Sequence, residues 1–383
     1  MLSRLTSPHL IPARDATHDA LNVAGLEREL RNAIDGEVRF SDGDRALYAT
    51  DASNYRQTPI GVVLPKTVED VIETVALCRR YGAPVLSRGG GTSLCGQCCN
   101  VAVVIDFSKY MNRIVELDEH NKWARVQPGL VLDDLRGAAN KYDLTFAPDP
   151  ATHSHNTLGG MLGNNSCGPH SVMGGETMHN VLELDVLLYD GTRLLLGPVD
   201  DETYAEALRG GGRRADIYRR LRELIATHAD EIRARFPAIP RRVSGYNLPV
   251  LLPENGFNLA QALVGSEGTC AVILEAKLRL VDWPRARSLL VLGYPSVYEA
   301  ADHITEVMDA RPIALEGMDD RLIADMKAVH LHPEDLKLLP EGKGWLMAEF
   351  GGDDKNEADA NAKKLIDRLR DVDSPPSMKL YDD

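Results

Sequence analysis

The stretch Arg88-Gly-Gly-Gly-Thr-Ser-Leu-Cys-Gly-Gln97 follows a short apolar segment that is typical of a β-strand. Three successive glycines at a strand end let the backbone approach a ligand and point its N–H groups inward, while Thr92 and Ser93 add hydroxyl donors. This suits a pyrophosphate, although a lone glycine triplet is just as typical of a tight turn. No Gly-Lys-Ser/Thr ending follows, and Leu94 stands where a Rossmann fingerprint starting at Gly89 needs its third glycine. A nucleotide site here would belong to a different fold.

The segments around this loop alternate between strand and helix patterns. Thr67-Val-Glu-Asp70 is a helix-start signature followed by apolar residues at helical spacing, and Gly82 ends that helix. After Trp283-Pro284 a β-α-β-α-β-α-β pattern begins. The predicted strands are 61–64, 84–87, 101–106, 113–118, 122–127, two within 182–196, 270–274, 288–293, 312–317, 344–351 and 378–381, and the predicted helices are 67–82, 131–142, 215–236, 296–309, 320–329 and 355–370.

Two further glycine clusters stand downstream. In Thr157-Leu-Gly-Gly-Met-Leu-Gly-Asn-Asn-Ser-Cys-Gly168, the amides of Asn164 and Asn165 can donate and accept hydrogen bonds, as the edge of a flavin ring requires. Gly265-Ser-Glu-Gly-Thr269 leads into an apolar strand. Residues 149–175 make a loop longer than a compact domain normally contains without a functional role. We expect the three glycine clusters to enclose one elongated ligand.

Composition limits the classes of function. A chain of 383 residues predicts two structural units, and a net charge of −14 with a pI near 5.3 opposes binding to nucleic acid or to an anionic membrane surface. Residues 1–20 lack the apolar core of a signal peptide, and no segment approaches the ~18 apolar residues of a membrane span. Six cysteines are too few for a disulfide framework. We therefore expect a cytoplasmic protein.

Six motifs in a fixed order carry a family resemblance. The chain resembles FAD-linked oxidases of the vanillyl-alcohol oxidase and p-cresol methylhydroxylase (PCMH) type. Within them it is most similar to bacterial FAD/FMN-containing dehydrogenases related to D-2-hydroxyglutarate, D-lactate and glycolate dehydrogenases. The motifs are Pro65-Lys-Thr-Val-Glu-Asp-Val71, Arg88 to Gln97, Val126-Gln-Pro-Gly129, Pro148-Asp-Pro150, Thr157 to Gly168 and Val264-Gly-Ser-Glu-Gly-Thr269.

The resemblance implies an α+β fold. It consists of a two-lobed PCMH-type FAD-binding domain over residues 51–283, after a helical extension over 1–50, and a partial ferredoxin-like α/β cap over 284–383. Relatives carry substrate-binding groups late in the cap and iron–sulfur motifs near the C-terminus. Neither is found in this sequence, so we expect an N-terminal portion of such a protein, truncated or completed by a separate chain.

The resemblance also implies FAD as the cofactor. Thr92 stands where some relatives attach FAD covalently through a histidine, so non-covalent FAD is expected. The residues expected to bind FAD are Arg88, Gly89, Gly90, Gly91, Thr92, Ser93, Pro148, Thr157, Gly159, Gly160, Asn164, Asn165, Gly168, Val181, Glu267, Gly268 and Ile273.

Catalytic candidates are few. His170, one of four histidines near the second cluster, could act as a base, and Arg56 could pair with a substrate carboxylate, although a loop hydrogen-bonder and a surface arginine are the plain alternatives. Cys95, Cys98 and Cys99 lack a fourth ligand, which favours packing beside the cofactor over a metal site.

The implied function is oxidation of a small anionic D-2-hydroxy acid, with the C2 hydrogen passing as hydride to N5 of the flavin. Two alternatives stay open at this stage. One is an FAD-binding subunit or fragment without catalysis of its own. The other is a relation to the flavin reductases of cell-wall precursor synthesis, against which residues 149–165 argue.

Overall fold

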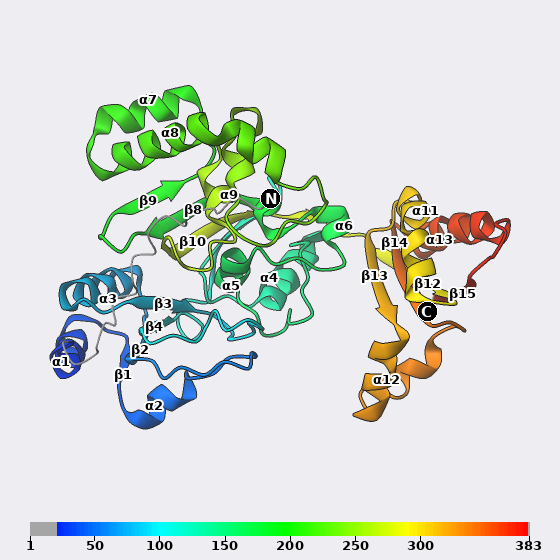
Figure 1. The fold of residues 1–383 in the computed structure, drawn as a ribbon, viewed down its shortest axis with the longest axis horizontal. Helices are drawn as coiled ribbons and strands as arrows, with labels where there is room; N and C mark the ends of the chain where they lie inside the picture. The colour runs from blue at the N-terminus through cyan, green and yellow to red at the C-terminus, as the bar shows by residue number, and fades with distance from the viewer. Residues whose placement is uncertain (1–20, 382–383) are drawn as a thin grey trace, which may run out of the picture. The chain divides into compact units, whose positions relative to one another are not determined.

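The computed structural model describes residues 21–381 (Figure 1), and these residues divide into two compact units. The first unit contains residues 21–88, 93–106 and 189–191, and the second contains 89–92, 107–188 and 192–381. Helices and strands are mixed in both. Among the described residues, no helix is both long and apolar enough to cross a bilayer. The expectation of no signal peptide in residues 1–20 lies outside the described residues.

The first unit is built on a four-stranded sheet of order β1-β2-β4-β3. Strands β2, β3 and β4 are parallel, while β1 pairs with β2 antiparallel. All four residues of β2 and of β4 are buried, as expected for strands covered on both faces. The elements are α1 (Val23–Ala33), β1 (Glu37–Arg39), α2 (Asp42–Leu47), β2 (Gly61–Leu64), α3 (Val68–Tyr81), β3 (Val85–Arg88) and β4 (Val103–Asp106).

One part of the first unit differs from expectation. A helical extension is predicted before residue 51, yet Glu37–Arg39 forms a strand that pairs with Leu64, Val63 and Val62. Three residues carry too little pattern to reveal a strand, and the pairing partner lies outside the segment. The ordered N-terminal segment is therefore part of the sheet.

Helix α3 begins and ends as the sequence predicts. Oγ1 of Thr67 accepts from the amide of Asp70 at 3.1 Å, and the Asp70 carboxylate accepts from the amide of Thr67 at 3.3 Å, which completes a capping box. Gly82 closes the helix with φ 72°. The Asp70 carboxylate also accepts from the amide of Asp35 at 2.9 Å, so this cap fixes the chain that leads into β1.

Removal of this cap has a predictable cost. We expect Thr67→Ala to lower the free energy of unfolding by about 1 kcal/mol, because the amide of Asp70 loses its acceptor. Urea denaturation followed by circular dichroism measures the change. Thr67→Ser keeps the hydroxyl and should stay within a few tenths of a kcal/mol of the natural protein. Equal loss in both variants would contradict the capping role.

The second unit begins with a five-stranded antiparallel sheet of order β5-β6-β10-β8-β9. Its core joins strand residues such as Val126 and Leu184 to residues of α4, α5 and α8. The elements are β5 (Ile114–Asp118), β6 (Trp123–Val126), α4 (Leu132–Ala139), β7 (Leu144–Thr145), α5 (Leu158–Asn164), α6 (Ser171–Gly174), β8 (Val181–Leu187), β9 (Arg193–Leu196), α7 (Asp201–Gly210), α8 (Gly212–Arg235), α9 (Leu259–Leu263), β10 (Val272–Arg279) and β11 (Val281–Asp282).

Helices α7 and α8 form a hairpin (Figure 1). Helix α7 is not predicted from the sequence, although Asp200 caps it by accepting a hydrogen bond from the amide of Thr203 at 2.8 Å. The arginines of α8 form local ion pairs such as Arg219–Asp216 at 2.8 Å and Arg235–Glu231 at 2.8 Å. The helix predicted over 215–236 is confirmed.

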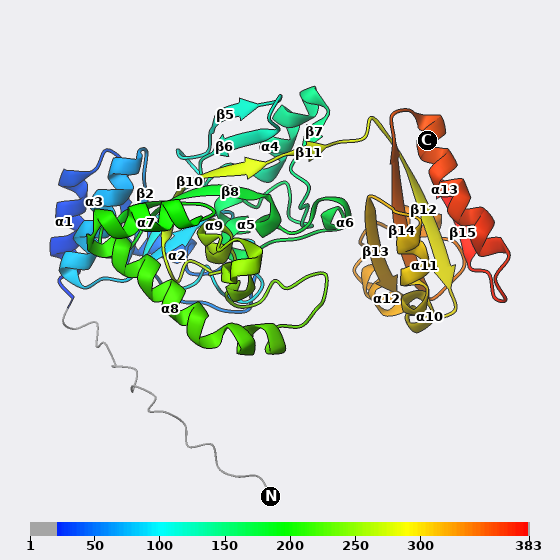
Figure 2. The same cartoon turned by 90° about the horizontal axis from the view of Figure 1, so that it is seen from above.

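The C-terminal part of the second unit is an antiparallel sheet of order β13-β14-β12-β15, with α13 along one face (Figure 2). Leu290 and Leu292 of β12 pack toward α13, while Val291 packs with Ile323 of α12. This alternation follows the two-residue period of a strand. The elements are β12 (Ala286–Tyr294), α10 (Val297–Asp302), α11 (Ile304–Asp309), β13 (Ala314–Asp319), α12 (Asp320–Ala328), β14 (Gly344–Gly352), α13 (Lys355–Arg370) and β15 (Ser377–Tyr381).

The predicted single helix over 296–309 is divided in two. His303 lies at the break, where its ring stacks on Tyr294 with centroids 5.1 Å apart and its Nδ1 lies 3.1 Å from a carboxylate oxygen of Glu306. Apolar spacing is the same on both sides of the break, so the periodicity alone could not reveal it.

Candidate functional site

The first glycine loop packs against the residues that lead into α5. A Cβ atom on Gly89 would lie 2.1 Å from Oγ1 of Thr157, and one on Gly90 would lie 2.2 Å from the carbonyl oxygen of His155. Real Cβ contacts are never this short, so both positions require glycine. Gly91 adopts φ 67°, the left-handed region that favours glycine. The glycines of the triplet therefore allow the first loop to lie directly against residues 155–157. This reason for glycine differs from the close approach of a ligand that the sequence predicts.

The third glycine loop joins the other end of α5. The amide of Gly265 donates to the carbonyl of Leu162 at 2.8 Å, and the amide of Glu267 donates to the carbonyl of Gly163 at 2.9 Å. These carbonyls belong to the last turn of α5, where a helix leaves its acceptors unsatisfied. The structure thus brings the three predicted clusters together around one short helix.

Asn156 lies beside the first loop with its carboxamide unused. Asn156 is 5 % exposed, and neither Oδ1 nor Nδ2 has a hydrogen-bond partner among the described residues. Its Cα would lie 3.3 Å from a Cβ on Gly90. Buried amides without partners are rare in folded proteins and often mark the place of a bound group. A polar ligand beside Gly90 would fit this environment.

Asn165 differs from Asn156 because its amide is fully engaged within the protein. Nδ2 donates to Glu176 at 2.9 Å, and Oδ1 accepts from the amide of Met178 at 3.0 Å. Asn165 also adopts φ 55° at the end of α5. These contacts hold the loop after α5 in place and leave no free donor or acceptor on the side chain for a ring edge.

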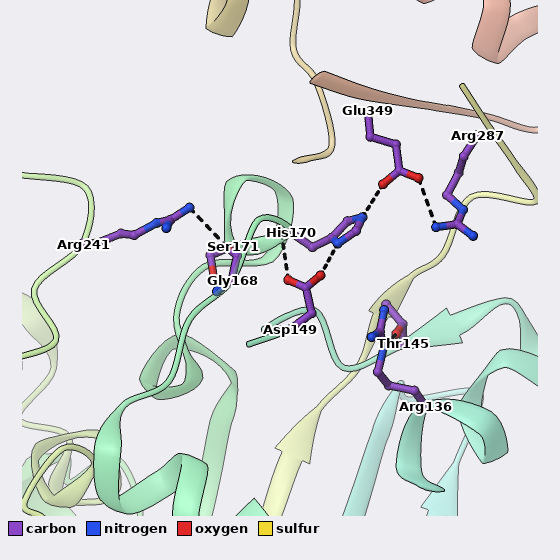
Figure 3. A network of polar contacts seen from close by, with 9 residues as sticks. All are labelled: Arg136, Thr145, Asp149, Gly168, His170, Ser171, Arg241, Arg287 and Glu349. Atoms are coloured by element: carbon purple, nitrogen blue, oxygen red, sulfur yellow. Dashed lines mark hydrogen bonds and ion pairs between the residues drawn. The ribbon is translucent and has the colours of Figure 1, made fainter. Parts of the chain in front are cut away.

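His170 lies between two carboxylates at the start of α6 (Figure 3). Nδ1 is 2.5 Å from Oδ2 of Asp149, and Nε2 is 2.6 Å from Oε2 of Glu349 on β14. The backbone amide of His170 also donates to Oδ1 of Asp149 at 2.9 Å. A histidine that bridges two carboxylates must carry a proton on each nitrogen, so the geometry makes His170 a hydrogen-bond donor rather than a base.

The protonation state of His170 follows from these contacts. Burial alone would lower the pKa of the imidazole, but the hydrogen bonds to Asp149 and Glu349 outweigh it and raise the pKa from 6.5 to about 9. The ring also lies against Trp283, with centroids 5.0 Å apart. His170 is therefore a buried imidazolium at neutral pH.

Two arginines extend this cluster. Nη1 of Arg287 lies 3.0 Å from Oε1 of Glu349, and the guanidinium of Arg287 lies 4.7 Å from the centre of the Trp283 ring (Figure 3). Arg136 lies 5.5 Å from the same ring and donates to Oγ1 of Thr145 at 3.3 Å. Sequence reasoning missed Glu349 and Arg287. The sequence feature that could have revealed them is a charged residue within a strand of mainly apolar residues.

Three predicted site residues, Arg88, Arg56 and Ser93, lie in the first unit with different surroundings. The guanidinium of Arg88 donates to the carbonyls of Cys98 at 2.9 Å and Thr50 at 2.8 Å, so it ties the glycine-loop strand to its neighbours. Arg56 is exposed, and only its backbone forms an isolated bridge, with Thr50. Oγ of Ser93 lies 3.2 Å from Sγ of Cys98.

The histidines near the second cluster other than His170 make local contacts. Nδ1 of His153 lies 2.7 Å from Asp133, and Nδ1 of His179 accepts from the amide of Glu176 at 3.1 Å. Nδ1 of His155 lies 2.8 Å from Oγ of Ser154, so each of these three histidines hydrogen-bonds a nearby polar group.

The remaining predicted residues fall in the loops and strands already described. Gly159 packs on Pro128 and Gly168 packs on Asp149, while the amide of Gly160 donates to Thr157 at 3.3 Å and Asn164 donates to Ser166 at 3.1 Å. Pro148 is buried and Thr92 is half-buried. Gly268 adopts φ 70°, Val181 is the first residue of β8, and Ile273 lies in β10. Their roles toward a cofactor stay predictions.

Comparison with known proteins identifies the two domains. Residues 59–197 match the family described as FAD binding domain, and residues 283–373 match FAD linked oxidases, C-terminal domain. The glycine loop at 88–97 and α5 lie in the first match, and Glu349 lies in the second. The buried carboxamide of Asn156, which has no partner among the described residues and lies beside Gly90, fits a polar cofactor of this kind. The resemblance inferred from the order of motifs is confirmed.

Relatives extend over most of this chain. It is 34% identical over 354 residues to D-2-hydroxyglutarate dehydrogenase of Pseudomonas putida, covering 90% of this chain and 35% of that protein. It is 29% identical over 293 residues to the glycolate oxidase subunit GlcD of Bacillus subtilis, covering 75% and 52%. The chain thus spans about a third of the first relative's length and about half of the second's.

A solved structure shares the fold. An alkyldihydroxyacetonephosphate synthase superposes with a TM-score of 0.62 at 18% identity, covering 90% of this chain and 58% of that one. At this identity the likeness concerns the fold alone. The two family matches identify an FAD binding domain over residues 59–197 and the C-terminal domain of FAD linked oxidases over residues 283–373, and they support FAD as the cofactor.

Proposed function

We propose that this chain forms the FAD-binding part of an oxidoreductase that oxidises a small D-2-hydroxy acid. Relatives named D-2-hydroxyglutarate dehydrogenase align over about nine-tenths of the chain, and the assembly of three glycine loops around α5 is the structural observation that carries the proposal. Among D-2-hydroxyglutarate, D-lactate and glycolate, we take the first as the preferred substrate because it names several relatives that are 30–34% identical to this chain.

We further propose the finer architecture. Residues 51–283 would form the two-lobed PCMH-type domain after an N-terminal extension over 1–50, and residues 284–383 would form part of a ferredoxin-like cap. The strand order β13-β14-β12-β15, antiparallel throughout, supports the ferredoxin-like assignment. A separate chain that completes the cap stays a prediction.

The proposed roles follow from the residues present. Gly91, Thr92 and Ser93 would hold the pyrophosphate of non-covalently bound FAD, and Asn156 would meet its polar edge. When bound, FAD supplies the acceptor, at N5, for the hydride that leaves C2 of the hydroxy acid. The exposed guanidinium of Arg56 would pair with the substrate carboxylate. His170 would act as a positioning residue that holds residues 149–170 against β14, because both its nitrogens carry protons.

The test is reduction of the bound flavin. We expect the purified chain to be yellow after addition of FAD and gel filtration, and anaerobic D-2-hydroxyglutarate to bleach the visible flavin band in a stopped-flow spectrophotometer. The L enantiomer is the matched control and should leave the band unchanged. D-lactate and glycolate, tested in the same way, establish which acid is preferred.

Each other outcome has a defined meaning. A colourless protein after FAD addition would contradict cofactor binding by the isolated chain. A yellow protein that none of the three acids bleaches, but that dithionite does, would overturn the proposed oxidation and favour an FAD-binding subunit without catalysis of its own.

A further inference from the structure

A groove of about 480 Å³ opens in the C-terminal part of the second unit, and its lining contains none of the residues assigned to FAD in the sequence. It lies between the end of α11 and one face of α13. Phe350 of β14 and Leu365 of α13 are both buried and contribute its apolar lining. Its volume falls within the range of small-molecule sites, about 300–1,000 Å³.

The face of α13 that lines the groove has a regular pattern. Asn361, Lys364, Leu365 and Arg368 are spaced i, i+3, i+4 and i+7, which places them on one stripe of the helix. Arg368 donates to the backbone carbonyl of Glu306 and so connects α13 to α11 across the groove. The stripe therefore presents two cations, one amide and one apolar side chain to the same space.

The cations of this groove lack carboxylate partners. Among the described residues, the guanidinium of Arg311 has no hydrogen-bond or ion-pair partner, the Lys364 ammonium contacts only the amide oxygen of Asn361 at 3.0 Å, and the Arg368 guanidinium contacts a backbone carbonyl. Asp309 is the one carboxylate in the lining, as far as residues 21–381 show. Arginines just outside it are paired, as Arg370 is with Asp367 at 3.1 Å.

The difference between the cations of the groove, which lack carboxylate partners, and the paired arginine outside it indicates that the groove binds an anionic ligand. Three cations against one carboxylate make a local excess of positive charge in a chain of net charge −14. Guanidinium groups bind the planar oxyanions of carboxylates and phosphates through paired N–H donors. We propose that the groove binds a small organic dianion, with its oxyanion groups on Arg311, Lys364 and Arg368 and its carbon chain against the half-buried Ile313, above the buried Phe350 and Leu365.

The dianion could be a dicarboxylate or a phosphate monoester, and the experiment separates the two. Isothermal titration calorimetry of the full FAD-loaded chain with glutarate, and separately with glycerol phosphate, should show saturable binding of at least one. The dissociation constant should rise with ionic strength because the groove is open to solvent.

The variant Arg311→Gly isolates the proposed contact. Arg311 adopts φ 55°, a conformation that glycine accepts without strain, so the fold should be preserved while the cation is lost. We expect the dissociation constant to rise by about tenfold or more in Arg311→Gly and in Lys364→Gln. Arg370→Gln, on the same helix but outside the groove, is the matched control and should bind as the natural chain does.

Two results would overturn the proposal. One is the absence of saturable binding of either dianion at low salt. The other is binding that Arg311→Gly and Lys364→Gln leave unchanged, which would place the dianion elsewhere, for example at the proposed hydroxy-acid site. Because flavin bleaching does not enter this measurement, failure of the groove and failure of the proposed oxidation are distinguishable.

Discussion

His170→Leu is expected to lower the free energy of unfolding at pH 7 by about 3 kcal/mol. The substitution removes a cation that two carboxylates contact at 2.5 and 2.6 Å, and removal of one partner from a buried ion pair costs about 3–5 kcal/mol. We expect the lower end of this range because Glu349 still has its ion pair with Arg287, and Asp149 still accepts a hydrogen bond from the backbone amide of residue 170. Urea denaturation followed by tryptophan fluorescence measures the change, and Trp283 reports directly on this cluster.

His153→Leu is the matched control. Its Nδ1 lies 2.7 Å from Asp133, a distance close to those of His170, but its side chain is 47% exposed against 10% for His170. Exposed ion pairs contribute about 0–1 kcal/mol. A loss from His153→Leu as large as that from His170→Leu would show that burial does not govern the effect, and would contradict the interpretation.

The pH dependence gives a second readout of the same contact. The pKa of His170 is raised from 6.5 in the unfolded chain to about 9 in the folded one, so its contribution is fully present below about pH 6.5. It is lost as the pH rises through 9. We expect the difference in unfolding free energy between the natural chain and His170→Leu to shrink by about 3 kcal/mol between pH 6.5 and pH 9 or above. A difference independent of pH would mean that the imidazole is neutral when buried.

Local patterns made much of the fold predictable. The capping residues around α3, the two strands within 182–196, and the strand and helix order after Trp283 all appear where the sequence places them. Each rests on residues that are neighbours in the chain, so their physical cause is visible in a short window. The glycine clusters were found for the same reason.

The arrangement of those clusters could not be read from sequence alone. Gly89 meets Thr157, and His170 meets Glu349, which is 179 residues further along the chain. No periodicity or motif joins such distant positions, so the carboxylate partners of His170 were missed and a base was expected where the structure has a donor. The unused amide of Asn156 was likewise invisible, because being buried without a partner is a property of the folded environment.

The contact between Gly89 and Thr157 leads to the second large expected effect. Thr157 cannot move aside at little cost, because its Oγ1 caps α5 by accepting from the amide of Gly160 at 3.3 Å and its side chain is buried. A methyl group on Gly89 would lie 2.1 Å from that oxygen. Either the first loop or the start of α5 must therefore shift, and both belong to the predicted cofactor site.

Gly89→Ala is thus expected to weaken FAD binding by about tenfold to a hundredfold, because forcing an extra methyl group into a packed contact costs about 1–3 kcal/mol. Titration of apoprotein with FAD, followed by flavin fluorescence, measures the dissociation constant, and circular dichroism checks that the variant is folded. Gly163→Ala is the matched control, since a Cβ atom there meets nothing within 4 Å, and it should bind FAD normally. If Thr157→Ala partly restores binding in Gly89→Ala, the steric contact is the cause. If Gly89→Ala binds FAD as tightly as the natural chain, the loop does not form this contact in the cofactor-bound protein.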